Sequence, residues 1–166
     1  MTIFPPQFVA PLRAWRIDQQ RHVDTWNSGV GAFNVGGRWN PKGVKVVYCS
    51  LDPSTAIIEV AVHKGFRALD TVPHVSTALE IANPTDVHVV MPSAVPNPTW
   101  LLPGIPSAGQ QAFGADLLAS KLFIAIPSAA SRQSWNLIFD PERTDGLYRT
   151  VLQERFALDT RLHPSP

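Results

Sequence analysis

The sequence predicts an α+β fold, because strand-like segments outnumber helical ones and do not alternate with them regularly. The chain has 166 residues, of which 45% are hydrophobic, so it is long enough to form a single domain over residues 1–166 with a true core. A doubly wound parallel sheet would need a regular strand–helix alternation, which is not found here.

The first two predicted strands lie before residue 51. Alternation in LRAWRI predicts a strand over residues 12–17. In this strand Arg16 points away from the side that Trp15 and Ile17 bury. Residues 44–50 are apolar and rich in β-branched side chains, which indicates a buried strand.

The clearest helix signal follows at once. Asp52 suits an N-cap, Pro53 suits the first turn, and Gly65 is a suitable stop. Further along, the pattern predicts strands over residues 74–81, 87–90, 121–126, 135–139 and 154–162, and one or two helical turns over 114–120. The segment from Pro92 to Gln111 contains five prolines and two glycines, and we expect a long surface excursion there.

Composition excludes several classes of protein. Only 16% of the residues are charged and the net charge is +1, which does not favour direct nucleic-acid binding. The apolar runs are too short for a membrane span, and the first residues do not resemble a signal peptide, so we expect a cytoplasmic protein. The five histidines have no metal-ligand spacing, and the single Cys49 reads as a buried thiol rather than a nucleophile.

Arg38 lies in a glycine-rich loop, GAFNVGGRWNPKG. Glycines allow close approach of the backbone to a ligand, and a guanidinium group suits phosphate oxygens. An anion site is one interpretation. The alternative is a long hairpin loop whose arginine caps backbone carbonyls.

Glu59 follows Ile57 and Ile58 and precedes Val60 on the predicted helix. A carboxylate among apolar side chains is costly unless it is hydrogen-bonded, so Glu59 is a candidate for binding a sugar hydroxyl or facing a developing cation. Alternatively, it lies on a narrow exposed stripe and pairs with Lys64 or Arg67.

Three further residues have both a functional and a structural interpretation. Arg16 is either a ligand-binding or a surface-facing strand residue, and Tyr48 is a site residue or a core aromatic with a bonded hydroxyl. Ser128 follows Ile126-Pro127 at a strand end, where a serine usually caps a turn.

The candidate residues lie in segments whose order along the chain resembles that of a known family. The segments WRI, GAFNVGGRWNPKGVKVVYCS, AIIEV and FIAIPSAASRQSWNLIFDP together resemble the RES domain, over roughly residues 12–141. This family is named after its Arg, Glu and Ser, and it is the toxin half of Xre–RES toxin–antitoxin pairs. The resemblance implies an ADP-ribosyltransferase-like fold, with a mixed β-sheet core and flanking helices, and consumption of NAD+.

The resemblance also implies a set of site residues. The family's strand and loop arginines fall on Arg16 and Arg38, its tyrosine on Tyr48, its acid on Glu59 and its serine on Ser128. Glu59, Arg16 and Tyr48 are then expected to be catalytic. Arg16, Arg38, Tyr48 and Ser128 are expected to bind NAD+, which is a substrate, with no metal and no further cofactor.

The implied function is a toxin that cleaves the nicotinamide–ribose bond, with water or phosphate as acceptor. One alternative is ADP-ribosylation of a cellular protein, and another is a non-catalytic module that binds a nucleotide or a partner. The expected partner is an Xre-type antitoxin, which would carry the DNA-binding activity. The acceptor, the mode of neutralisation, a homo-oligomeric state and the role of residues 92–111 stay open.

Overall fold

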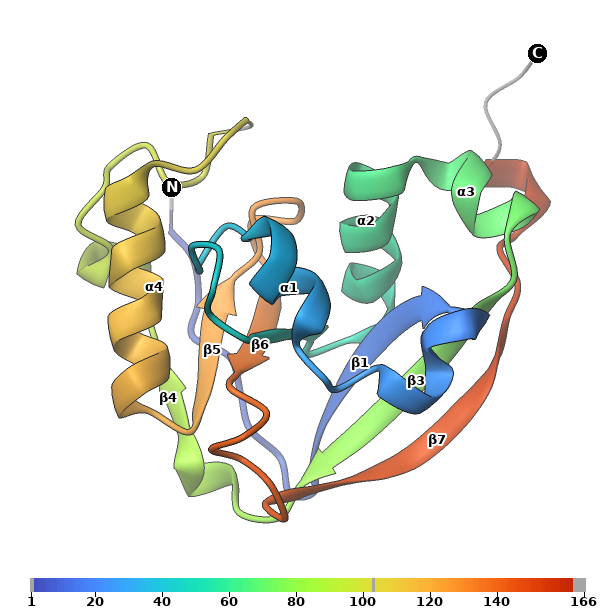
Figure 1. Ribbon diagram of the computed structural model, residues 1–166. Coiled ribbons are helices and arrows are strands. Elements are labelled where there is room, and N and C mark those ends of the chain that lie inside the picture. The colour runs from blue at the N-terminus through green and yellow to red at the C-terminus, as the bar shows by residue number, and fades with distance from the viewer. Residues whose placement is uncertain (1, 103, 163–166) are drawn as a thin grey trace.

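The computed structural model describes residues 2–102 and 104–162, and its centre is a seven-stranded sheet (Figure 1). The strands are β1 (Leu12–Gln19), β2 (Val47–Ser50), β3 (His74–Ile81), β4 (Val87–Val89), β5 (Phe123–Pro127), β6 (Trp135–Phe139) and β7 (Tyr148–Phe156). Their order is β4-β5-β6-β2-β1-β3-β7, with β4 and β5 parallel and the other neighbours antiparallel. The sheet is therefore mixed, and the α+β prediction is confirmed.

Helices flank this sheet. They are α1 (Val30–Val35), α2 (Pro53–Lys64), α3 (Phe66–Thr71) and α4 (Ala108–Ser120), with short 3-10 turns at Gln20–Thr25, Pro84–Asp86, Pro92–Ala94 and Thr160–Leu162. Helix α2 begins and ends as predicted. Asp52 accepts a hydrogen bond from the Thr55 amide at 2.8 Å, and Gly65 ends the helix with a φ of 77° that favours glycine.

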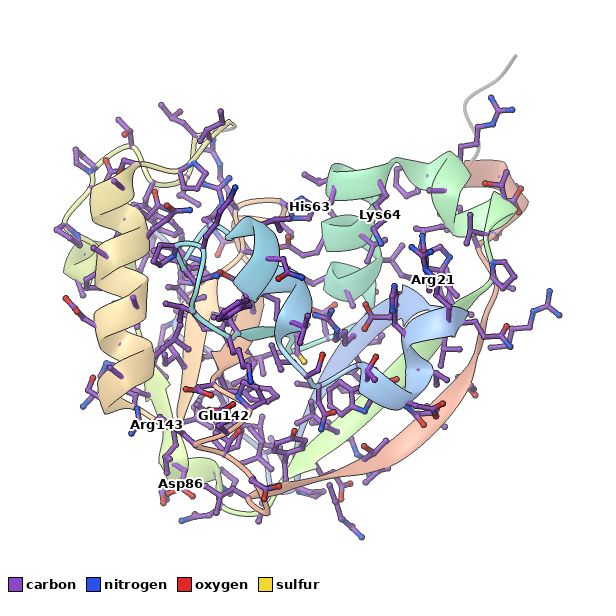
Figure 2. The ribbon with its side chains drawn as sticks, viewed as in Figure 1. Arg21, His63, Lys64, Asp86, Glu142 and Arg143 are labelled. Atoms are coloured by element: carbon purple, nitrogen blue, oxygen red, sulfur yellow. The ribbon has the colours of Figure 1, made fainter. Side chains whose placement is uncertain are left out.

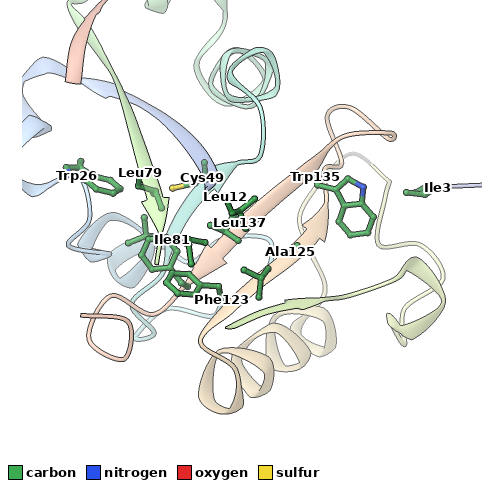
Figure 3. Packing of buried hydrophobic residues seen from close by; sticks show 14 residues of the cluster. Ile3, Leu12, Trp26, Cys49, Leu79, Ile81, Phe123, Ala125, Trp135 and Leu137 are labelled. Atoms are coloured by element: carbon green, nitrogen blue, oxygen red, sulfur yellow. The ribbon is translucent and has the colours of Figure 1, made fainter. Parts of the chain in front are cut away.

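The two faces of the sheet bury different clusters. On one face, Ile124, Ile126 and Ile138 pack with α4, while Ile17 packs with Ala56 of α2. On the opposite face lies the larger cluster of Figure 3, which includes Leu12, Cys49, Leu79, Phe123 and Leu137 together with Ile3 and Trp26 from outside the sheet. Helices α2 and α4 thus cover the same face of the sheet (Figure 1). The candidate site lies on this face.

Strands β1 and β2 are joined more loosely than the other neighbours. Their register contains the single pair Trp15 and Ser50, whereas β1 and β3 pair over eight residues. Beyond Trp15 the two strands separate, which leaves backbone groups of β2 to find other partners.

Several predicted boundaries were wrong. Helix α4 starts at Ala108 rather than residue 114, because Ser107 caps it by accepting from the Gln110 amide at 3.2 Å. Strand β7 covers Tyr148–Phe156 rather than 154–162. Its interior residues are exposed, so the strand shows none of the apolar signal on which the prediction depended. Helix α1 occupies the first part of the glycine-rich segment, where the sequence predicts a loop.

The proline-rich segment is less exposed than expected. Val95 and Trp100 are both buried and pack with Ile124 and Ile126 on the α4 face of the sheet. The segment therefore contributes to the core. Within the described part of the chain, no helix is both long and apolar enough to cross a membrane.

Candidate active site

The carboxylate of Glu59 is hydrogen-bonded through one of its two oxygens. Ser128 Oγ and Asn136 Nδ2 each donate to Glu59 Oε1, both at 2.6 Å. Among the described residues none donates to Oε2. The carboxylate is thus held in a fixed orientation, with one oxygen available to a ligand.

The alternative ion pair of Glu59 with Lys64 or Arg67 is not observed, because Glu59 faces the sheet rather than solvent-exposed cations of the next turns. Figure 2 labels Lys64 on the last turn of α2, beside His63. The apolar residues Ile57, Val60 and Ala61 of α2 pack against the buried cluster of Ile17, Ala56, Leu69 and Leu158.

Asn136 is a residue of the site that sequence reasoning missed. It lies on β6 directly opposite Ser50 of β2, and Ser50 Oγ donates to Asn136 Oδ1 at 2.9 Å. This bond fixes which way the amide points, so that Nδ2 faces Glu59. The available signal was an asparagine within the otherwise apolar strand sequence WNLIF.

Ser128 caps the turn after β5, as its position suggested, and its hydroxyl also holds Glu59. Its buried hydroxyl accepts from the amides of Ala130 and Ser131, at 3.1 and 3.0 Å, which closes the turn after β5. The same hydroxyl donates its proton to Glu59. Turn formation therefore orients the donor that holds the carboxylate.

The hydroxyl of Tyr48 is fully used by the glycine-rich loop. It donates to Asn40 Oδ1 at 2.7 Å and accepts from the Trp39 amide at 3.1 Å. Burial raises the pKa of Tyr48 well above its ordinary value. The nearby charge of Arg38 lowers this pKa, and that of Glu59 raises it. Tyr48 is thus a neutral phenol whose hydroxyl is already bonded within the protein.

Arg38 has a backbone partner and no described ion pair. Its Nη1 donates to the Trp100 carbonyl at 2.8 Å, and none of the ion pairs among described residues includes Arg38. No carboxylate of the described residues therefore pairs with this guanidinium. The neighbouring Trp39 is buried against Trp100 and Phe113, with ring centroids 5.6 and 6.5 Å away, so it packs in the core rather than facing a ligand.

Gly37 shows why this loop requires glycine. A Cβ at position 37 would lie 2.6 Å from Asn40 Oδ1 and 2.7 Å from Tyr48 Oη. The close approach predicted from the glycines is thus made, at this position, to the protein's own side chains.

Arg16 is held differently. Its Nε and Nη2 donate to the Asp18 carboxylate at 2.5 and 3.0 Å, and its Nη1 donates to the Tyr48 carbonyl at 2.7 Å. By strand alternation Arg16 starts from the face of β1 opposite to Trp15 and Ile17, as predicted. Its guanidinium bridges the gap where β1 and β2 separate, and it supplies a donor to a β2 carbonyl there.

The five predicted site residues are therefore not all in contact with one another. Glu59 and Ser128 are in direct contact, and Arg16 donates to the Tyr48 carbonyl. Arg38 and Glu59 both lie close enough to Tyr48 to affect its pKa. A cavity of about 410 Å³ lies elsewhere, between α2, β1 and β7, and none of the five predicted residues lines it. Among the described residues there is no group of three His, Cys, Asp or Glu side chains that could hold a metal.

Cys49 is a buried, unpaired thiol, as the sequence indicated. Burial raises its pKa to about 12, so it is protonated and unreactive at neutral pH.

Three comparisons bear on this arrangement. The model of the RES domain family matches residues 13–159. A protein named toxin Res, from Pseudomonas putida, is 30% identical over 149 residues, covering 89% of this chain and 97% of that protein. A protein named Prs ADP-ribosylating toxin, from a Sphingobium species, is 29% identical over 137 residues, covering 79% of this chain and 83% of that protein.

A solved structure supports the fold. A chain in the crystal structure of the M. tuberculosis MbcT–MbcA toxin–antitoxin complex superposes with a TM-score of 0.68 at 16% identity, over 87% of this chain and 84% of that one. The expected architecture, an ADP-ribosyltransferase-like mixed sheet with flanking helices, is confirmed by this likeness together with the topology.

Proposed function

The chain belongs to the RES domain family, the family of its toxin relatives, and we propose that it is a toxin that cleaves the nicotinamide–ribose bond of NAD+. The observation that carries this proposal is the carboxylate of Glu59, which Ser128 and Asn136 hold through Oε1 while Oε2 stays available. A fixed carboxylate of this kind suits a reaction in which positive charge develops on a sugar ring.

The proposed reaction breaks the bond between ribose C1′ and the nicotinamide nitrogen. The bonding electrons leave with nicotinamide, which departs neutral, and the ribose ring becomes oxocarbenium-like. Glu59 stabilises this charge and binds a ribose hydroxyl, and no acid is needed for the leaving group. Water or phosphate then bonds to C1′. With water the products are ADP-ribose, nicotinamide and one proton.

The remaining residues receive supporting roles. Arg38, whose charge is not paired among described residues, binds the diphosphate, and Ser128 keeps Glu59 in place. Tyr48 presents its ring to the nicotinamide–ribose end while its hydroxyl holds the loop. Arg16 joins the diphosphate site only by exchanging part of its contact with Asp18 for a phosphate, so its contribution is smaller than that of Arg38.

A second candidate function keeps this site and changes the acceptor. The relative named Prs ADP-ribosylating toxin favours transfer of ADP-ribose to a protein. In either case we propose action in the cytoplasm, and a protein antitoxin of the Xre type as the partner, in line with the toxin–antitoxin complex of the structural neighbour.

The test uses purified protein and NAD+ labelled in the adenylate phosphate, with phosphate present or absent and with lysate present or absent. Label in free ADP-ribose, or in its 1-phosphate when phosphate is present, supports cleavage to a small acceptor. Label on a protein band that appears only with lysate supports the second candidate. Intact NAD+ after prolonged incubation in every sample would favour a non-catalytic binding module.

A further inference from the structure

We infer that Asn97 and Gln111 are positioning residues that set the place of the Arg38 guanidinium, which makes the proline-rich segment and α4 part of the diphosphate-binding apparatus. This inference rests on the proposed role of Arg38. Neither residue touches the Glu59 group. Asn97 acts through the Trp100 carbonyl, which binds the Arg38 side chain, and Gln111 acts through the backbone of Gly37.

The first contact runs through a turn over Asn97–Trp100. The Trp100 amide donates to the Asn97 carbonyl at 3.2 Å, and Asn97 Oδ1 accepts from the amide and the hydroxyl of Thr99 at 3.0 and 2.8 Å. These bonds fix the turn at whose end the Trp100 carbonyl receives Arg38 Nη1.

Asn97 also ties this turn to the start of α4. Its Nδ2 lies 3.3 Å from Gln110 Oε1 and 3.4 Å from Ser107 Oγ, and Ser107 is the N-cap of the helix. The Trp100 ring is buried against Trp39. Two features therefore fix the Trp100 carbonyl that binds Arg38. They are the buried Trp100 ring and the hydrogen-bonded turn over Asn97–Trp100.

The second contact comes from α4 itself. Gln111 Nε2 donates to the Gly37 carbonyl at 2.9 Å, next to Arg38 in the chain. On the other side of Arg38, the Trp39 backbone lies so close to Gly114 that a Cβ there would be 2.0 Å from the Trp39 carbonyl oxygen. Both neighbours of Arg38 thus rest on one helix.

These contacts determine where a mobile cationic side chain can point. The backbone around Arg38 is pinned to α4 on both sides, and one of its nitrogens is bound to a fixed carbonyl, so the other nitrogens are presented in a defined direction. Such preorganisation strengthens binding because less side-chain freedom is lost when the anion arrives.

The experiment measures binding of ADP-ribose, which contains the diphosphate and is not cleaved, by calorimetry on the full chain. Asn97→Ala and Gln111→Ala each remove one side-chain anchor, so each should weaken ADP-ribose binding by roughly 2- to 10-fold. Asn97→Asp keeps the acceptor that forms the turn and loses the donor to α4, so it should weaken binding to a similar degree. The value of kcat at saturating NAD+ should change by less than about 2-fold, because the Glu59 group is untouched.

Gln153→Ala is the matched control. Gln153 Nε2 donates to the Val23 carbonyl at 3.2 Å, a bond of the same type on β7, and its loss should leave ADP-ribose binding unchanged. Each variant is also combined with Arg38→Ala. If Asn97 and Gln111 act through Arg38, neither change should weaken binding further in that background.

The outcomes separate this inference from the proposed function. If Arg38→Ala weakens binding but Asn97→Ala, Asn97→Asp and Gln111→Ala do not, or if their losses persist in the Arg38→Ala background, the positioning role is wrong and the proposed function stands. If the wild-type chain does not bind ADP-ribose, or Arg38→Ala binds it equally well, the diphosphate role of Arg38 is wrong, and the inference falls with it.

Discussion

Ser128 donates its hydroxyl proton to Glu59 Oε1 at 2.6 Å, which joins the turn after β5 to the middle of α2. The serine oxygen is itself fixed by two backbone amides, so its proton has one direction in which to point. The two residues lie 69 positions apart in the sequence. This hydrogen bond fixes the orientation of the Glu59 carboxylate on α2.

Glu59→Gln should lower the rate of NAD+ loss by about 10²-fold, or roughly 3 kcal/mol of barrier, because a neutral amide cannot stabilise the developing positive charge. The measurement is release of nicotinamide by the purified protein. Glu142→Gln is the control. Glu142 follows β6 in the chain and is labelled in Figure 2, and its exposed carboxylate pairs with Lys45. Near-normal turnover by Glu59→Gln would remove Glu59 from the mechanism.

Asn136→Ala should reduce kcat by about 10-fold, because Glu59 loses one of the two donors that orient it. Asn27→Ala provides the comparison. Asn27 also donates its amide to a side-chain oxygen, that of Tyr148, at 2.8 Å, and Tyr148 packs with the cluster on the opposite face of the sheet. Equal losses of activity in the two variants would show that Asn136 matters only for folding.

Sequence reasoning succeeded where local signals were strong. Strands β3 and β6 match their predicted bounds because their apolar runs are continuous, and α2 matches because Asp52 and Gly65 mark its ends. The family resemblance grouped Glu59 with Ser128 in one site, but their direct contact is seen only in the structure. Residue types alone left Glu59 open between a buried and an exposed position.

The remainder depended on tertiary structure. Strand β7 is stabilised by pairing with β3 rather than by burial of its own side chains, so no periodicity revealed it. The role of Asn136 in the site depends on the strand register that places it opposite Ser50, and the sequence does not show this register. By contrast, Arg16 and Asp18 are two residues apart on β1 and share a face, but the bond of Arg16 to the Tyr48 carbonyl depends on the position of β2.

Arg38→Ala should relieve the growth arrest that we expect when this chain is expressed without its antitoxin, because the diphosphate loses its unpaired cationic partner. Colony counts after induction give the measurement, with the amount of soluble protein determined in parallel. Arg67→Ala, which removes an exposed cation on α3, should remain toxic. A soluble Arg38→Ala variant that still arrests growth would contradict the anion-binding role.

Glu80 makes the free energy of unfolding dependent on acid pH. It accepts hydrogen bonds from Arg149 on β7 at 2.6 Å and from Arg13 on β1 at 2.9 Å, and these partners lower the pKa of its carboxyl. A lowered pKa means that this stabilisation is present above the unfolded value, near 4.3, and is lost as pH falls through the folded value.

Urea unfolding between pH 7 and pH 3 measures this dependence. Glu80→Gln should be less stable than the wild type at pH 7 and should lose less stability on acidification. Glu142→Gln, with a carboxylate that is 71% exposed, should follow the wild-type profile. An acid limb of unchanged slope in Glu80→Gln would show that other carboxylates dominate it.

Gly114→Ala should destabilise the fold although alanine is the better helix former. A Cβ at residue 114 would lie 2.0 Å from the Trp39 carbonyl oxygen and 2.8 Å from its Cα, and these are backbone atoms that cannot move aside. We expect a loss of about 1–3 kcal/mol by overpacking, measured by urea unfolding. Gly109→Ala on the same helix is the matched control, because the nearest atom to its Cβ is Ser107 Oγ at 4.0 Å. That change should be neutral or stabilising by up to about 1 kcal/mol. If both variants were equally stable, the close contact of α4 with the Arg38 loop would not exist in solution.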